Sequence, residues 1–154
     1  METIMKKETK LYNVLFPVWM LLIFPMSWIV IIPGNFLIDS LVLVISMFAL
    51  RMAEKKTFYK KNILKVFIFG FLADLIAAGI MFLLHILFEL GGPLADELIL
   101  TVPGLLIAAG LIFVFNYFIS FRKAEKGIRL KLALIFAIAT APYTFLIPSS
   151  WMYS

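Results

Sequence analysis

The chain has 154 residues, of which 64% are hydrophobic and only 15% are charged, and its formal net charge is +5. Soluble domains are about 45–50% apolar and about 25% charged, so this composition indicates an integral membrane protein and excludes most soluble enzymes. The lack of cysteine excludes disulfides, iron–sulfur clusters and thiol nucleophiles, and the single histidine, His85, excludes a multi-histidine metal site. We therefore expect no cofactor.

Five apolar segments are long enough, or nearly long enough, to cross about 30 Å of hydrocarbon as helices. They lie at residues 12–32, 36–51, 62–88, 98–121 and 131–147. The first two are separated by a turn that is predicted at Pro33-Gly34-Asn35. The sequence thus predicts an all-α polytopic membrane protein, in which residues 1–154 form a single domain, a bundle of five transmembrane helices.

The basic residues alternate strictly between successive connections. All 14 Lys and Arg lie in the N-terminal segment, between the second and third spans, or between the fourth and fifth, including the edges of these spans. Because cytoplasmic loops carry the excess of Lys and Arg, this pattern predicts a cytoplasmic N-terminus and an external C-terminus in the cytoplasmic (inner) membrane. The predicted partner of the basic residues is the layer of anionic lipid headgroups on the cytoplasmic side, and not nucleic acid.

Small residues on three of the spans predict the faces through which helices pack. They are Gly70, Ala73, Ala77, Ala78 and Gly79 in the third span, Gly104, Ala108, Ala109 and Gly110 in the fourth, and Ala133, Ala137 and Ala141 in the fifth. The alternative to packing within one chain is that one of these faces contacts a second copy or a membrane partner protein. Asn116 and Thr140 are interpreted as polar contacts between helices.

Asp74 is the ionisable residue that lies deepest in a predicted span, roughly 18 Å from each end of the third. Insertion scales assign a central Asp a cost of about 2.5–3.5 kcal/mol, so such a group faces the protein interior or water. No Lys or Arg is predicted at that depth, which favours a carboxyl that holds a proton or a cation. The alternative is a neutral carboxyl, hydrogen-bonded to Asn116, Thr140 or a backbone carbonyl.

A line of titratable residues is predicted to lead outward from Asp74. His85 follows it by 11 residues, which places both within about 20° of one helix face, and Glu89 lies one turn further out. The turn at 33–35 would put Asp39 at the depth of His85, so these two are predicted to pair. Together Asp74, His85, Glu89 and Asp39 are predicted to form a proton or cation pathway from the outside. The alternatives are local: Asp39 as a helix cap, and His85 with Glu89 as a surface pair.

These observations favour a non-enzymatic membrane protein of proton- or small-cation-linked transport. The first alternative is a non-catalytic accessory, scaffold or immunity-type protein, and the second is an intramembrane aspartyl hydrolase. Residues 34–39 and 71–74 resemble the aspartate motifs of lipoprotein signal peptidases, but the first has one residue too many between Asn35 and Asp39, and the second lacks its Asn. The predicted depths of Asp39 and Asp74 also differ by about 12–14 Å, too much for a dyad.

Overall fold

The structure, a computed structural model, describes residues 25–89 and 97–146. Within these residues the chain is helical and forms no strand, which confirms the predicted all-α class. The α-helices are α2 (Trp28–Ala49), α3 (Lys55–Glu89), α4 (Glu97–Phe115) and α5 (Lys126–Ala139). Two 3-10 turns, η2 (Pro25–Ser27) and η4 (Tyr143–Leu146), and one π-helical turn, η3 (Asn116–Ser120), complete the described elements.

Three segments of the described chain are long and apolar enough to cross a membrane: Pro25–Ala49, Lys55–Leu87 and Thr101–Ser120. The predicted helices at residues 62–88 and 98–121 are confirmed in α3 and in α4 with η3. Large apolar side chains, among them Ile29, Leu37, Leu83 and Leu106, are more than half exposed on these segments. Such a surface suits contact with lipid, because in water it would expose extensive apolar patches.

The predicted turn at Pro33-Gly34-Asn35 is wrong, because α2 runs through these residues as one helix. Pro33 lies inside α2 and removes one backbone donor from it. Membrane helices tolerate proline and glycine, since a non-helical backbone in hydrocarbon would leave more polar groups unpaired. Residues 28–32 and 36–49, assigned to two predicted spans, therefore belong to one helix, and residues 12–24 of the predicted first span lie outside the described residues.

The predicted fifth span, residues 131–147, is also wrong in its bounds. α5 has 14 residues and ends at Ala139, so it is about 21 Å long, shorter than the roughly 30 Å of a hydrocarbon core. The helix ends because Pro142 has no N–H and disfavours a helical conformation in the residue before it. The backbone N and Oγ of Thr140 both donate to the carbonyl of Phe136. These two hydrogen bonds close α5 within one helix, and the side-chain bond is not the predicted contact between helices.

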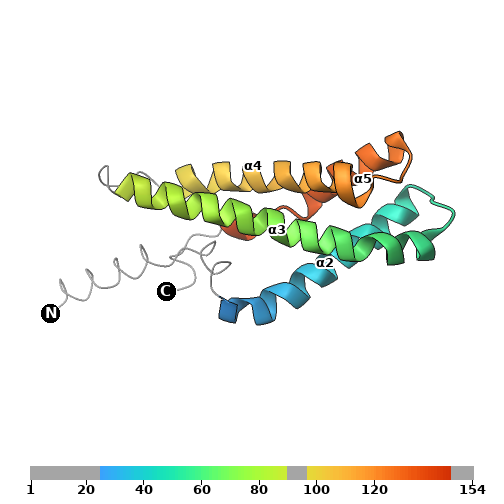
Figure 1. The fold of residues 1–154 in the computed structure, drawn as a ribbon, viewed down its shortest axis with the longest axis horizontal. Helices are drawn as coiled ribbons and strands as arrows, with labels where there is room; N and C mark the ends of the chain where they lie inside the picture. Colours follow the sequence, from blue (N-terminus) through green and yellow to red (C-terminus); the bar gives the residue numbers. More distant parts are fainter. Residues whose placement is uncertain (1–24, 90–96, 147–154) are drawn as a thin grey trace.

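Figure 1 shows α3 and α4 side by side over most of their length, with α2 packed on α3 and α5 packed on α4. The connection from α2 to α3 and the connection from α4 to α5 lie at the same end of the bundle. The first contains Arg51 and leads into Lys55 and Lys56, and the second contains Arg122 and Lys123. We call this part of the molecule the basic end.

α2 stops at the basic end in a hydrogen-bonded cap. The backbone N of Arg51 donates to the Phe48 carbonyl and that of Met52 to the Met47 carbonyl, both at 3.1 Å. This is the Schellman pattern, which requires a left-handed residue at the position of Arg51. Arg51 has φ 51°, a conformation that glycine adopts at lower cost. The cap reverses the chain so that α3 can pack antiparallel to α2.

A close approach of α3 and α4 sets how the two helices are aligned. A Cβ on Gly104 would collide with the side chain of Met81, which is fully buried. Further along the bundle, the rings of Phe69 and Phe115 lie 5.5 Å apart. Gly104 is therefore opposite Met81, and Phe115 is opposite Phe69. The predicted contact face is confirmed at Gly104.

Gly104→Ala is expected to lower the free energy of unfolding by about 1–3 kcal/mol, because the new methyl group overpacks the contact with Met81. The measurement is reversible unfolding in mixed detergent micelles. Gly110→Ala on the same helix is the matched control, since a Cβ there meets nothing within 4 Å. In a Met81→Ala background the penalty of Gly104→Ala should disappear. An equal penalty for both glycine variants would contradict the close approach.

Candidate functional site

Asp39 projects from the middle of α2 into its interface with α3. Only 5% of its surface is exposed. Its Oδ2 lies 3.6 Å from the position that a Cβ would occupy on Gly70 of α3. Because Gly70 has no side chain, the carboxyl of Asp39 can reach the surface of α3. Asp39 therefore lies inside the bundle and far from both ends of the Pro25–Ala49 segment.

The predicted pairing of Asp39 with His85 is wrong. His85 lies 15 residues beyond Gly70 on the same helix, which is about 22 Å along its axis. The pairing depended on a turn at 33–35, and the continuous α2 carries Asp39 much deeper than that turn would. His85 is half-buried. Glu89 is the last residue of α3, and its side chain lies outside the described part of the chain, so the pathway role of both remains a prediction.

Asp74 lies on α3 one turn after Gly70, and it faces the same interface as Asp39. It is 7% exposed, and the two carboxyl groups are close enough to interact electrostatically. Its Oδ1 is buried and has no hydrogen-bond partner. The vertical gap of about 12–14 Å that the sequence indicated between the two acids is therefore wrong, for the same reason as the predicted pairing with His85.

Asn116 is the third buried polar residue at this level of the bundle. It follows Phe115, which is opposite Phe69, so it lies close to the level of Gly70 on α3. It is 1% exposed, and neither its Nδ2 nor its Oδ1 has a hydrogen-bond partner. The predicted hydrogen bond from Asn116 to another helix is therefore not formed.

Asp39, Asp74 and Asn116 come from three different helices, and we call them the polar layer. Along α3, their levels fall within about one turn, or roughly 6 Å, of Gly70. The sequence has no Lys or Arg in residues 11–50 or 66–121, so no basic side chain of α2 or α4 belongs to this layer. Native proteins pair nearly all their buried polar groups, so unpaired atoms on two of the three residues mark a candidate binding site.

The donor set of the polar layer restricts what it can bind. Two carboxyl groups and one amide offer oxygen acceptors and a single N–H₂ donor group. The described residues contain no group of three or more His, Cys, Asp or Glu that could hold a metal ion. Divalent cations favour six or more oxygen ligands with several carboxylates. The layer is therefore better suited to a proton or a small monovalent cation.

Sequence reasoning grouped Asp39 with Asp74 in one pathway and named Asn116 as an alternative hydrogen-bond partner of Asp74, but it placed Asp39 at the depth of His85 and not at the level of Gly70. One signal was present in the sequence: Gly70 precedes Asp74 by four residues, so both lie on one helix face where a neighbour can approach closely. No protein-family model, curated protein or solved structure matches this chain. The interpretation of the polar layer therefore depends on its own geometry and chemistry.

The contact between Asp39 and α3 can be tested by cross-linking, because the chain has no cysteine. The double variant Asp39→Cys/Gly70→Cys is expected to be joined efficiently by a short bifunctional thiol reagent in membranes. The pair Asp39→Cys/His85→Cys is the matched control, and about 22 Å of helix rise keeps it from reacting. Gel mobility after proteolysis between the two positions reads out the cross-link. Preferential reaction of the control pair would restore the turn at 33–35.

Proposed function

We propose that this chain is a small integral membrane protein that binds a proton or a monovalent cation at the polar layer and moves it across the cytoplasmic membrane. The observation that carries this proposal is the pair of buried carboxyl groups, Asp39 and Asp74, on two helices of membrane-spanning length. A buried acid without a cationic partner is costly in an apolar interior, so it needs a neutralising species. The spanning segments offer no fixed cation at that depth.

The chemistry of the pair supports a mobile neutralising species. Two carboxyl groups at one helix interface can share one proton, or can hold a small cation between their oxygens. Asn116 can donate an N–H to a carboxylate or offer its amide oxygen to a cation. Ala77 and Ala78, which follow Asp74 by about one turn, are fully buried in a cluster with Met81 and Ala108. In this proposal, His85 and Glu89 form the path by which the ion reaches Asp39 and Asp74 from the outside.

We place the basic end of the bundle at the cytoplasmic face, because Lys and Arg concentrate on the cytoplasmic side of membrane proteins. All the basic residues of residues 25–154 lie in the two connections at this end or in the helix turns that adjoin them. α2, α3 and α4 expose large apolar side chains, and such surfaces suit contact with a second copy of the chain or with a membrane partner protein. An assembly of this kind remains part of the proposal.

The test is ion flux into liposomes that contain the purified full chain. Acidification of a trapped pH-sensitive dye follows protons, and parallel runs with sodium or potassium gradients follow cations. We expect the wild-type chain to conduct at least one of these ions faster than empty liposomes and Asp74→Asn to lose this activity. Equal flux with the wild type, Asp74→Asn and empty liposomes would overturn the proposal and favour an accessory protein.

Intramembrane aspartyl hydrolysis is a second candidate, and the burial of Asp39 and Asp74 at one helix interface favours it. An acid dyad activates water through one protonated and one ionised carboxyl group. The two candidate functions differ in the ion flux expected of the wild-type chain, because only a transport protein is expected to conduct ions into liposomes. A hydrolase would leave the liposomes impermeable and would cleave a membrane peptide only when both acids are present.

A further inference from the structure

The basic end of the bundle contains a cavity. This cavity of about 710 Å³ lies between the first turns of α3 and the connection from η3 to α5. The charged residues that line it are Glu54, Lys61, Lys65, Arg122, Lys123 and Glu125. Lys65 precedes Asp74 by nine residues, which is about 13 Å along α3. The lining includes none of Asp39, Asp74 and Asn116, so the cavity is distinct from the site proposed for ion binding.

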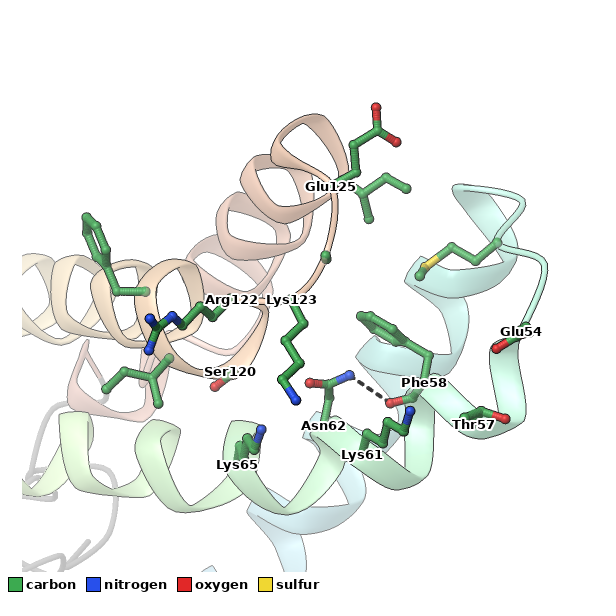
Figure 2. Close-up of a pocket in the computed structure, with 15 residues that line it drawn as sticks. Glu54, Thr57, Phe58, Lys61, Asn62, Lys65, Ser120, Arg122, Lys123 and Glu125 are labelled. Carbon is green, nitrogen blue, oxygen red and sulfur yellow. Dashed lines mark hydrogen bonds between the residues drawn. The ribbon is translucent and has the colours of Figure 1, made fainter.

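Two of the basic side chains that line the cavity, Lys65 and Lys123, approach each other from α3 and from the α4–α5 connection. Figure 2 shows Lys123 extending from the α4–α5 connection toward α3, where Lys65 points toward it and Lys61 points away, toward Phe58. Glu125 points away from this region, so it does not neutralise the lysines there. Four basic and two acidic lining residues leave an excess of two positive charges. Such a cavity attracts an anion and repels a cation, so it is unsuited to be the inner mouth of a cation path.

Buried polar groups complete the site. Ser120 lines the cavity with only 2% of its surface exposed, and its Oγ has no hydrogen-bond partner. Asn62 lines it from α3 and is held in place by a 2.9 Å bond from its Nδ2 to the Phe58 carbonyl. Ser120 ends the π-helical turn η3, a rare distortion that often marks functional positions. The unpaired hydroxyl is a donor that an anionic oxygen can use.

The remaining wall of the cavity is apolar and faces outward. Phe118 and Ile119 line it and are exposed on the side of η3, and Ile128 lines it from α5. A cavity with a cationic polar part and an exposed apolar wall matches an amphiphile more closely than a soluble anion. We propose that it binds the phosphate headgroup of one anionic phospholipid, whose acyl chains lie along Phe118 and Ile119.

This site is more specific than a general attraction of basic loops to an anionic surface. Diffuse attraction depends on the number of Lys and Arg near the membrane and not on their place in the fold. In a specific binding site, by contrast, affinity depends on the residues that line the cavity, and one lipid binds per chain. Seven basic residues of the described chain lie outside the lining, among them Lys56 and Lys126, and they allow the two mechanisms to be separated.

The experiment is a titration of the full chain in neutral detergent, followed by native mass spectrometry. The lipids are phosphatidylglycerol and, as the zwitterionic control, phosphatidylcholine, and inorganic phosphate is tested as a competitor. We expect one phosphatidylglycerol per chain, no comparable binding of phosphatidylcholine, and little competition at millimolar phosphate. Equal binding of both lipids would overturn the proposal, and complete displacement by inorganic phosphate would reassign the cavity to a soluble anion.

Two double variants distinguish binding at a specific site from diffuse electrostatic attraction. Lys65→Gln/Lys123→Gln is expected to weaken phosphatidylglycerol binding by about tenfold or more, since it removes two charge-assisted contacts. Lys56→Gln/Lys126→Gln changes the net charge equally and is expected to change binding by less than about twofold. Ser120→Ala keeps the charge and is expected to weaken binding by about threefold. Equal losses in the two double variants, or no loss with Ser120→Ala, would contradict the site.

Discussion

In liposomes, Asp74→Asn is expected to lower the transmembrane flux of the transported ion by about tenfold or more, which corresponds to about 1.4 kcal/mol or more in the barrier. Asparagine keeps the size of the side chain but cannot take up a proton or carry a negative charge. Asp74 is buried beside Asp39, and the spanning segments contain no other acid at that level. The loss should therefore appear in the maximal rate and should not be restored by a larger gradient.

Asp39→Asn is expected to give a loss of similar size, and the double variant should be little worse than either single variant. Residues that act as one unit show strongly non-additive effects, because the first substitution already removes the function of both. Asp74→Glu should keep part of the flux, since it retains a carboxyl group. Independent, multiplying losses would contradict a shared binding site.

Ser46→Ala is the matched control for the flux measurements. Ser46 lies two turns after Asp39 on the buried face of α2, and its hydroxyl donates only to the Val42 carbonyl of its own helix. Its replacement perturbs the same interface without removing an acid. Wild-type flux in Ser46→Ala, together with a loss in both Asp variants, would assign the effect to the carboxyl groups.

Phe121→Ala is expected to have the largest effect on stability, a loss of about 3 kcal/mol in the free energy of unfolding. Phe121 is 1% exposed and lies between two aromatic partners. Its ring stacks on Phe58 of α3 at 5.9 Å and lies 5.7 Å from Phe136 of α5. This loss is at the low end of the range for a buried Phe. In a membrane an apolar side chain can also contact lipid, so the substitution removes mainly van der Waals packing and little hydrophobic free energy.

Phe118→Ala, on the π-helical turn that ends just before Phe121, is the control, because Phe118 is 60% exposed. Its substitution is expected to cost less than about 1 kcal/mol. Unfolding of both variants in mixed micelles, followed by far-UV circular dichroism, gives the comparison. If Phe118→Ala were as destabilising as Phe121→Ala, the orientation of the turn would have to be revised.

Much of the fold was predictable because a long apolar segment strongly predicts a membrane-spanning helix. The helices at 62–88 and 98–121 follow from unbroken apolar runs between charged segments, and the contact at Gly104 follows from its small size. The errors came from the prolines. In the sequence, Pro33 indicated a turn and Pro142 was compatible with a continuing helix, whereas the chain stays helical at Pro33 and leaves the helix before Pro142. Local propensity alone does not separate these outcomes, because packing partners decide them.

The candidate site was predictable residue by residue but not as an arrangement. The depth of Asp74 followed from its place in one long apolar run. The approach of Asp39 depends on α2 being continuous, and the level of Asn116 depends on the alignment that Gly104 and Met81 set between α3 and α4. These are relations between helices, and a single sequence contains no direct record of them.

The depth of the polar layer has a consequence for any charge bound there. Its position near the middle of α2 and α3 means that a cation arriving from either face crosses about half of the transmembrane potential. A full crossing is worth about 2.3 kcal/mol per charge at 100 mV, so half of it shifts occupancy by about sevenfold. A cell that polarises or depolarises its membrane would thereby load or empty this site without any change in ion concentration.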